Sequence, residues 1–413
     1  MNNHNIYIIG SGVSGLIAAK VLEDYGFSPN ILEASSKVGG RVKTDIVSGY
    51  QLDRGFQVLL TAYPLAKKYL NIDALNLQKF SPGAVIFNEG KQNILGDPLR
   101  ETSLLIPTIF SRIGNFSDKI KVLRLNKALK SKTVDEIFKE KEKTTLAYLI
   151  DFGFSSQMID CFFKPFFSGI FLESNLNTSS RMFEFIYKMF GEGYAALPKS
   201  GIQAIPNQIA ESLNRTNIQF NSVVNSVKDG HITLKNGNEL ESDFTIVATK
   251  ASSLISNLKN QAIKWKSCDT LYFETEHRVV EKPLIGLIPN PKALINNIFY
   301  NTSLKTDSSA TKELLSVTIV KKHNLTEEEL IFEIKKELDD YCGISSCKFL
   351  KRYNIPFALP DLDSVEYDIE PSETQLTSRI FLAGDMQLNG SLNAAMLSGE
   401  KAALAVVNAI NEN

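Results

Sequence analysis

The chain begins with a short apolar segment followed by an amphipathic one. Ile6–Ile9 is a run of mainly apolar side chains that ends at Gly10, which is typical of a buried strand. From Val13 to Tyr25 the apolar residues recur at helical spacing, and Gly26 ends that pattern. A second short strand is indicated at Asn30–Leu32. Strand, helix and strand within about 30 residues predict a βαβ unit.

The rest of the chain divides into a helical region and short strand patterns. Residues 100–194 are rich in Lys, Leu and Phe and predict mostly helix, and Glu327–Asp340 and Leu392–Ile410 predict two further helices. Asn236-Gly237 indicates a hairpin turn. A second sheet is indicated by Leu271–Phe273 and Leu315–Val320. The other predicted strands are Ile218–Phe220, Ser226–Lys228, His231–Leu234, Glu239–Leu240, Phe244–Ala248 and Arg379–Ala383.

Length and charge narrow the class of protein. A chain of 413 residues is long for one hydrophobic core, so we expect two domains. The net charge of -1 gives no overall attraction for nucleic acid, which we do not expect as a partner. The four Cys and four His have no metal-ligand spacing, so no metal is expected. The chain enters its first strand without a leader-like segment, which favours a cytoplasmic protein; the sequence carries no signal of an oligomeric state.

A glycine-rich turn joins the first predicted strand to the first predicted helix. Gly10, Gly12 and Gly15 have the spacing that lets backbone approach a pyrophosphate and lets the helix pack closely on the strand. Glu33 ends the second strand, where an acid bonds the ribose hydroxyls of a dinucleotide. The expected nucleotide contacts in this unit are Gly10, Gly12, Val13, Ser14, Gly15, Glu33 and Ala34.

A second glycine pair follows the βαβ unit. Gly39, Gly40 and Arg41 supply bare backbone and a guanidinium that suit another phosphate contact. With Glu33 and Thr44 they form the pattern E-x(5)-GGR-x-x-T. This segment resembles the flavin amine oxidase superfamily, which includes protoporphyrinogen oxidases, phytoene desaturases and carotene isomerases.

Three later segments extend the resemblance in family order. Leu52–Gln57 is similar to the stretch that passes near the flavin ring, so Gln57 is a candidate contact. Phe220–Val227 is similar to the strand pair whose valine backbone contacts the adenine, which implies Val224. In the last segment the family's Asp bonds the ribityl chain, and Ser391 can cap a helix whose N-terminus stabilises the reduced flavin. The implied contacts there are Gly384, Asp385, Ser391, Leu392 and Asn393.

The resemblance implies an α/β fold of the FAD-binding, Rossmann-type two-dinucleotide-binding-domain class, with an inserted α+β substrate domain. The expected FAD-binding domain comprises residues 1–75, 195–265 and 366–413. The substrate domain comprises 76–194, with 100–194 helical, and 266–365. The cofactor implied is non-covalent FAD, because residues 389–396 contain no Cys of the kind that carries covalent flavin in some amine oxidases.

The inserted region is unusually aromatic. Residues 151–194 hold 12 of the chain's 39 aromatic side chains, and Pro165–Phe171 resembles the Pro-Phe-x-x-Gly-Ile-Phe stretch of desaturase and porphyrinogen-oxidase relatives. We expect an apolar substrate chamber, or else an ordinary aromatic core. The candidate chamber residues are Tyr353, Phe357, Phe166 and Lys164; Tyr353, Lys164 and Lys250 are also candidate proton acceptors.

These features predict an oxidoreductase that moves a hydride from a large apolar substrate, of polyene, isoprenoid or porphyrinogen type, to flavin N5. An amine oxidase that makes hydrogen peroxide is a weaker alternative, since the only Trp, Trp265, lies outside the family's aromatic segment. A redox-neutral carotene isomerase is another. The third is an FAD-less binding scaffold like the Rab GDP-dissociation inhibitors, against which the intact Gly384-Asp385 and Gly39-Gly40-Arg41 segments argue.

The segment from residue 104 to residue 143 has two interpretations. Leu104–Phe110 is mostly apolar, and residues 112–143 hold ten Lys or Arg against five Asp or Glu. An apolar patch beside a basic helix can dock on a bilayer, which would suit a lipid-soluble substrate. The sequence favours the other interpretation, a segment packed on the body beside a solvated helix face.

Overall fold

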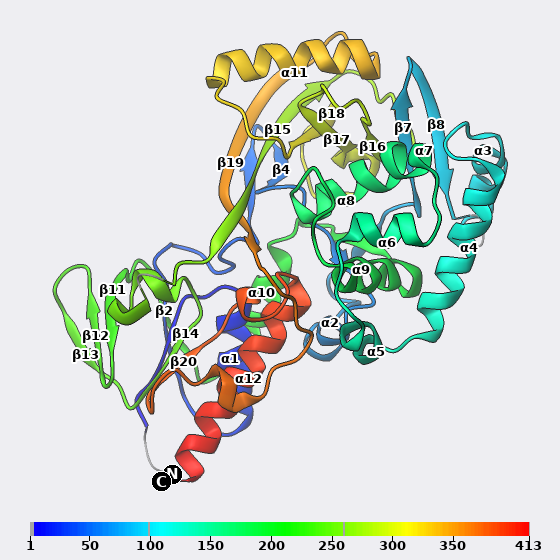
Figure 1. The fold of residues 1–413 in the computed structure, drawn as a ribbon. Coiled ribbons are helices and arrows are strands. Elements are labelled where there is room, and N and C mark those ends of the chain that lie inside the picture. Colours follow the sequence, from blue (N-terminus) through cyan, green and yellow to red (C-terminus); the bar gives the residue numbers. More distant parts are fainter. Residues whose placement is uncertain (1–3, 98–99, 259–260, 413) are drawn as a thin grey trace.

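The computed structural model describes residues 4–97, 100–258 and 261–412. The outermost residues of the predicted FAD-binding domain, 1–3 and 413, lie outside this range. Figure 1 shows a parallel sheet in the lower part of the molecule and a larger mixed sheet in the upper part, with a group of helices beside the larger sheet. The division of the chain into domains at 75, 194, 265 and 365 stays a prediction.

Five short strands form the parallel sheet. All four neighbouring pairs run parallel, which confirms the Rossmann-type sheet predicted from the βαβ unit. The strands come from the start, the middle and the end of the chain, so segments far apart in sequence lie side by side. In spatial order they are β10 (Asn217–Gln219), β2 (Asn30–Leu32), β1 (Ile6–Ile9), β14 (Phe244–Val247) and β20 (Ile380–Leu382).

Both faces of this sheet are covered, which is why its strands, except the edge strand β10, are short and mainly apolar. One side packs with helices α1 (Val13–Asp24), α10 (Ala204–Glu211) and α12 (Leu392–Asn411). The other side packs on a small antiparallel sheet, β11 (Val224–Lys228), β12 (His231–Leu234) and β13 (Glu239–Glu241), through Val227 and Ile232. The hairpin predicted at Asn236-Gly237 joins β12 to β13.

Seven strands form the larger sheet, in which every pair except β7 with β16 is antiparallel. Helix α11 (Glu327–Cys342) packs on it through Leu330, Ile334 and Leu338, which lie four residues apart on one helix face. In spatial order the strands are β19 (Lys348–Asp361), β15 (Lys264–Thr275), β18 (Glu313–Ile319), β17 (Ile295–Tyr300), β16 (Ile285–Leu287), β7 (Gly83–Asn88) and β8 (Lys91–Gly96).

Strand β15 is longer than the sequence predicted. Only Leu271–Phe273 reads as apolar strand, yet the strand starts at Lys264 because pairing with β19 continues to Asp361. The polar start of β15 is held by backbone hydrogen bonds rather than by burial, so its composition gave no strand signal. The predicted boundary at residue 265 therefore falls inside one strand.

Residues 100–194 are mostly helical, as predicted. A π-helical turn at Ile159–Phe163 precedes Pro165, which has no N–H to continue the regular ladder. The helices are α3 (Leu105–Phe110), α4 (Phe116–Ser131), α5 (Val134–Lys139), α6 (Thr145–Asp151), α7 (Ser156–Met158), α8 (Lys164–Phe171) and α9 (Ser180–Glu192). The remaining elements are α2 (Pro64–Tyr69), the β3 (Thr44–Val47) and β4 (Tyr50–Asp53) pair, and the sheet β5 (Leu59–Leu60), β9 (Ala195–Pro198), β6 (Leu77–Lys79).

Helices α1 and α12 cross with almost no space between their backbones. A Cβ atom at Gly399 would lie 2.2 Å from the carbonyl oxygen of Ser14. We expect Gly399→Ala to lower the free energy of unfolding by about 1–3 kcal/mol, because one helix must shift. Gly191→Ala is the control: it is helical and exposed, with nothing within 4 Å of the added Cβ, so we expect a gain of about 0.5–1 kcal/mol. Urea denaturation measures both, and an unchanged stability in Gly399→Ala would refute the contact.

Candidate cofactor and substrate site

One continuous cavity of about 2100 Å³ connects the parallel sheet to the helical region. It reaches the carboxyl ends of β1 and β2 at one end and helices α3 and α4 at the other. The structure brings together residues that the sequence places in five separate segments. The predicted cofactor contacts that line it are Gly10, Gly12, Val13, Ser14, Glu33, Ala34, Gly39, Gly40, Arg41, Gln57, Val224, Gly384, Asp385, Ser391 and Leu392.

The three glycines of the first turn have different surroundings. Gly10 has a φ of +99°, which few other residues adopt. A Cβ at Gly15 would lie 2.0 Å from the Gly10 carbonyl oxygen, so Gly15 keeps α1 close to β1 and does not itself line the cavity. A Cβ at Gly12 would meet nothing within 4 Å and would project into open cavity. This bare backbone at the start of α1 fits the pyrophosphate of FAD.

The Glu33 carboxylate is held in place by two serines. Oε2 accepts from the Ser11 N–H at 2.8 Å and its hydroxyl at 2.7 Å, and Oε1 accepts from the Ser35 N–H at 2.8 Å and its hydroxyl at 2.7 Å. Burial alone would raise the pKa of Glu33, but these four hydrogen bonds lower it below its ordinary value. An ionised acceptor therefore stands at the end of β2, as ribose recognition requires.

Arg41 and Asp385 form an ion pair across the cavity wall. The Asp385 side chain is 5% exposed, and the Arg41 guanidinium also donates to the carbonyl of Ala358 at 3.1 Å and lies 5.1 Å from the centre of the Trp265 ring. The second glycine pair thus brings a cation to the last predicted segment, at the place where the cofactor's phosphate and ribityl groups are expected. Lys250 is a further cation here, and its ammonium lies over the Phe357 ring.

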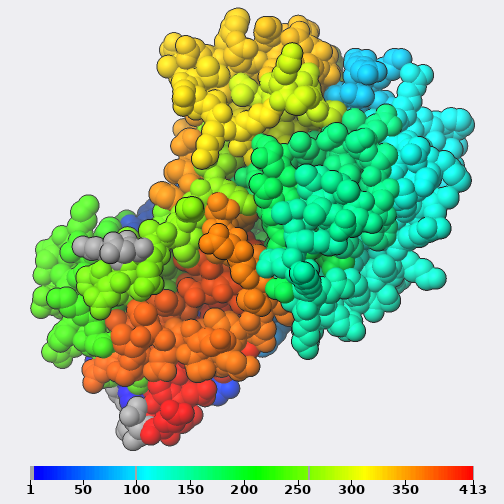
Figure 2. Space-filling model, in the orientation of Figure 1, coloured from blue at the N-terminus to red at the C-terminus, as the bar shows by residue number. Residues whose placement is uncertain are grey.

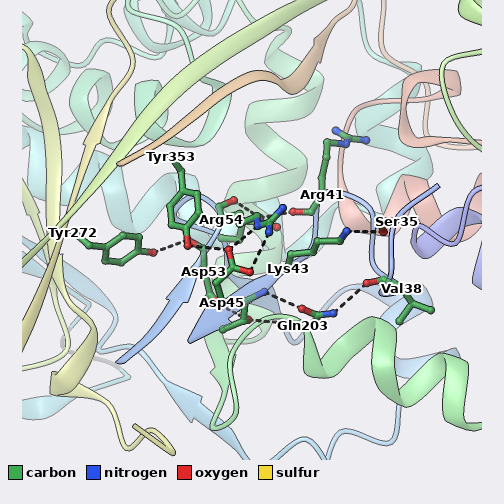
Figure 3. Close-up of polar contacts among 12 residues, drawn as sticks. Ser35, Val38, Arg41, Lys43, Asp45, Asp53, Arg54, Gln203, Tyr272 and Tyr353 are labelled. Atoms are coloured by element: carbon green, nitrogen blue, oxygen red, sulfur yellow. Dashed lines mark hydrogen bonds and ion pairs between the residues drawn. The ribbon is translucent and has the colours of Figure 1, made fainter. Parts of the chain in front are cut away.

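A polar network supports the wall beside Arg41 (Figure 3). Asp45 accepts from Arg54 Nε at 2.8 Å and from the Tyr353 hydroxyl at 2.9 Å. Burial and the Asp45 carboxylate both raise the pKa of Tyr353, so its hydroxyl stays protonated. Tyr353 lines the cavity as predicted, but this geometry argues against it as a proton acceptor. Gln57 donates to the carbonyls of Arg41 and Arg54 and so ties the two segments together.

The final helix begins at the cavity. The Ser391 hydroxyl caps α12 by accepting from the Ala394 N–H at 3.0 Å, as predicted, which leaves the N-terminal N–H groups next to the cavity. Asn393 differs from the expectation for its side chain. It is fully buried, its Oδ1 accepts from the Leu65 N–H at 3.0 Å, and it does not line the cavity. Its polar side chain serves the contact between α12 and α2.

Aromatic rings form the wall of the distal half of the cavity. Phe166 on α8 lies 5.6 Å from both Phe162 and Phe190, measured between ring centres, and all three line the cavity. Phe357 lines it from β19. Lys164 was predicted here as well, but it does not line the cavity. It directly precedes Pro165, and the helical turn that aims Phe166 inward directs Lys164 elsewhere.

Sequence reasoning missed the contribution of β15. Trp265, Lys266 and Cys268 all line the cavity from the polar start of this strand. Lys266 Nζ donates to the Thr178 hydroxyl at 3.1 Å and lies 3.6 Å from Asp361 Oδ1. Trp265 meets Phe357 edge to face, with 6.1 Å between ring centres. The only signal was the alternation of bulky and charged side chains at 264–266, which is too short to predict a strand.

Among the residues that the structure describes, none of the helices is long and apolar enough to cross a membrane.

Asp53 is a buried carboxyl group at the end of β4, and its pKa lies within the pH range in which the stability of the protein can be measured. Its Oδ1 accepts from the Thr44 hydroxyl at 2.6 Å and the Ile202 N–H at 3.1 Å, yet burial raises its pKa from 3.8 to about 6. The folded protein then keeps a proton that the unfolded chain releases, so this group costs stability as the pH rises from 4 to 6. We expect Asp53→Asn to gain about 3 kcal/mol relative to wild type between pH 4 and pH 7.

Urea denaturation of wild type and variant across that pH range measures the difference. Asp73→Asn, at an exposed position, is the control for loss of one negative charge. A difference between Asp53→Asn and wild type that does not change with pH would show that Asp53 is ionised throughout.

The open space at Gly12 gives a direct test of the cofactor cradle. Gly12 has an ordinary φ of -66°, so Gly12→Val strains no backbone and fills only the cavity. We expect the variant to fold but to lose the visible flavin band after purification. The apoprotein's unfolding midpoint, compared with that of wild-type apoprotein, controls for folding. A full flavin content in Gly12→Val would place the pyrophosphate elsewhere.

The chain matches the family model of flavin containing amine oxidoreductases over residues 13–407. Two curated relatives are similar over shorter stretches. An L-amino-acid oxidase of Sistrurus catenatus edwardsii is 37% identical over 79 residues, 19% of this chain and 15% of the relative. L-amino acid oxidase Bs29 of Bothriechis schlegelii is 27% identical over 156 residues, 36% of this chain and 30% of the relative. The chain thus matches less than a third of the length of either relative.

Solved structures share the fold over the whole chain. A provisionally named protoporphyrinogen oxidase of Exiguobacterium sp. 255-15 has a TM-score of 0.71 at 17% identity, covering 98% of this chain and 99% of that one. Cyclohexylamine oxidase of Brevibacterium oxydans IH-35A has a TM-score of 0.71 at 15% identity, covering 99% and 100%. At such identities the likeness shows the fold alone. The family match over nearly the whole sequence, together with the cradle described above, shows that this chain belongs to the flavin-containing amine oxidoreductases.

Proposed function

We propose that this FAD-dependent oxidoreductase oxidises a large apolar substrate of polyene, isoprenoid or porphyrinogen type. The observation that carries the proposal is the aromatic-walled chamber that opens directly into the cofactor cradle. Typical ligand pockets measure roughly 300–1,000 Å³. A cavity of about 2100 Å³ therefore has room for FAD and for a second large molecule.

The residues of the chain bind and orient the two molecules and keep water out. Glu33, the glycine turn and Arg41 hold the nucleotide half of the cofactor, and the N-terminus of α12 favours negative charge beside it. FAD, when bound, supplies the acceptor for a hydride. Phe162, Phe166 and Phe190 exclude water from the substrate side and offer large apolar surfaces.

The walls offer little help with removing a proton from the substrate. Tyr353 is protonated and donates to Asp45, and Lys164 does not line the cavity. Burial and Arg41 lower the pKa of Lys250, but its ammonium lies over Phe357. A substrate that loses a hydride from a carbon skeleton fits this wall, because conjugation stabilises the carbocation that is left behind. That carbocation is acidic enough to give its second hydrogen as a proton to water, which completes the new double bond without a strong base from the wall.

Oxidation of an amine is the second candidate, favoured by the likeness of this chain to two L-amino-acid oxidases and to cyclohexylamine oxidase. Trp265, which lies outside the aromatic segment in the sequence, packs against Phe357 in the structure, so two aromatic rings meet at the cavity wall. Both rings, however, are covered by cations: Arg41 lies over Trp265 and Lys250 over Phe357. An ammonium substrate would be repelled at this pair, so we place amine oxidation second.

The test is anaerobic reduction of the FAD-loaded protein by representative polyenes, a porphyrinogen and small amines. Reduction is measured as the loss of the visible flavin band. We expect a polyene or the porphyrinogen to reduce the flavin. Rapid reduction by amines alone, with hydrogen peroxide formed in air, would establish the second candidate. Conversion of a polyene with no net reduction would indicate an isomerase, and a protein that takes up no FAD would be a binding scaffold.

A matched pair of variants locates the substrate. Phe166→Ser places a hydroxyl in the aromatic wall, and we expect kcat/KM for the apolar substrate to fall roughly tenfold or more while the flavin content stays constant. Phe332→Ser is the control, because Phe332 is exposed on α11 and does not line the cavity. Equal rates for the two variants would show that the substrate does not occupy the chamber.

A further inference from the structure

Exposed apolar side chains gather on helices α3 and α4. Among the described residues, fourteen large apolar side chains are exposed, and seven of them lie between residues 105 and 123. Ile106 is 68% exposed, and Phe110 and Phe116 are each 79% exposed. We call this group the α3–α4 patch; its members are Leu105, Ile106, Ile109, Phe110, Phe116, Ile120 and Leu123. In Figure 2 these cyan helices form the right-hand edge of the molecule.

Helix α3 is held in place by polar contacts instead of by burial. None of its six residues is buried. The Thr108 hydroxyl accepts from the Gly96 N–H at 2.9 Å, and Lys119 Nζ donates to the carbonyls of Ile109 and Ser111 at 2.9 and 3.0 Å. Lys119 thereby satisfies carbonyls at the end of α3 and fixes it against α4. The apolar side chains are therefore exposed on a surface that is fixed in place. The interpretation that the sequence favoured, in which this segment packs on the body of the protein, does not hold for these side chains.

The exposed charges on the segment that carries the patch are cationic. Residues 105–131 contain six cationic side chains and one acid, Asp118. Asp118 is fully buried and accepts from the Ser155 N–H and hydroxyl at 2.9 and 2.6 Å, so its charge does not face solvent. Arg124 and Lys127 are exposed. The cationic residues are Arg112, Lys119, Lys121, Arg124, Lys127 and Lys130.

The patch lies where the substrate cavity meets the surface. Leu105, Ile109, Phe116 and Leu123 are exposed and also line the cavity. Ile106 and Phe110 are exposed but do not line it. An apolar path therefore runs from the outer surface of α3 into the aromatic chamber, and a molecule entering here need not cross bulk water.

We propose that the α3–α4 patch docks on an anionic phospholipid bilayer and that the substrate enters the chamber directly from that bilayer. The proposal rests on the proposed function, because only an apolar substrate dissolves in the bilayer. Apolar side chains beside exposed Lys and Arg match a surface of acyl chains beneath anionic headgroups. Each exposed cation strengthens the attachment, and the apolar side chains enter the headgroup boundary.

A second copy of the chain fits the patch less well. A symmetric dimer would place this surface against itself, since a twofold interface uses the same patch on both subunits. Arg124 and Lys127 of both copies would then meet at one interface without an exposed acid from residues 105–131 to pair with them. Like charges so placed oppose association.

Co-sedimentation of the FAD-loaded protein with vesicles tests the docking. We expect binding to vesicles of phosphatidylcholine with phosphatidylglycerol, weaker binding to phosphatidylcholine alone, and loss of binding at high salt. Ile106→Ser with Phe110→Ser, and separately Arg124→Glu with Lys127→Glu, should each weaken binding roughly tenfold or more. The controls are Phe332→Ser and Lys335→Glu with Lys336→Glu, which change exposed positions of α11 and should bind as wild type does.

Equal vesicle binding by all variants, or no binding by wild type, would overturn the proposal. The proposal would also be overturned if sedimentation velocity without lipid showed a dimer of the wild type and a monomer of the Ile106→Ser, Phe110→Ser variant, because the patch would then be a dimer interface. Flavin reduction by detergent-dispersed substrate is measured on the same samples and reports on the proposed function separately. If the protein oxidises the dispersed substrate but does not bind vesicles, the proposed function stands and the docking proposal is wrong. If it binds vesicles but oxidises no apolar substrate, the docking surface stands and the proposed function is wrong.

Discussion

The close crossing of α1 over α12 is the constraint on which the cofactor cradle depends. Gly399 lets the backbone of α12 come so near that its missing Cβ would touch the Ser14 carbonyl, and Gly15 does the same between α1 and β1. These two contacts bring the start of α1 and the start of α12 to the same end of the parallel sheet. Bare N–H groups from residues nearly 380 positions apart therefore face one cavity.

Charge in the cradle is balanced by local hydrogen bonding. Glu33 stays ionised because Ser11 and Ser35 compensate for burial, and the Arg41 guanidinium is held by Asp385 and by the Ala358 carbonyl. Asp45 similarly holds Arg54 and Tyr353. The charged side chains of Glu33 and Arg41 are thus each fixed by neighbours, so this part of the site is preorganised and little ordering is left to be done on binding.

The substrate half of the molecule follows a different principle. Its wall is largely aromatic and apolar, and its outer end is a surface of apolar side chains on helices that also carry exposed cations. A protein gains stability by burying such side chains, so leaving seven of them exposed on two neighbouring helices is a cost that a binding role offsets. Residues of the chamber and of the patch line one cavity from α8 to α3. In our proposal, this cavity connects the place where the substrate enters to the place where it reacts.

The local sequence determined the nucleotide unit almost completely. Strand, glycine turn, helix and terminal acid from Ile6 to Glu33 all act within about 30 residues, so spacing alone predicts their geometry. The cap at Ser391 and the helices of residues 100–194 were likewise predicted correctly, because they too depend on neighbouring residues in the sequence. Tertiary structure alone decided what depended on distant partners. Pairing with β19 made the polar start of β15 a strand and brought Trp265 and Lys266 into the cavity. Contacts with α2 turned Asn393 away, and Asp45 engaged Tyr353. Such outcomes depend on which distant surfaces pack together, and the residues that neighbour a position along the chain do not determine that packing.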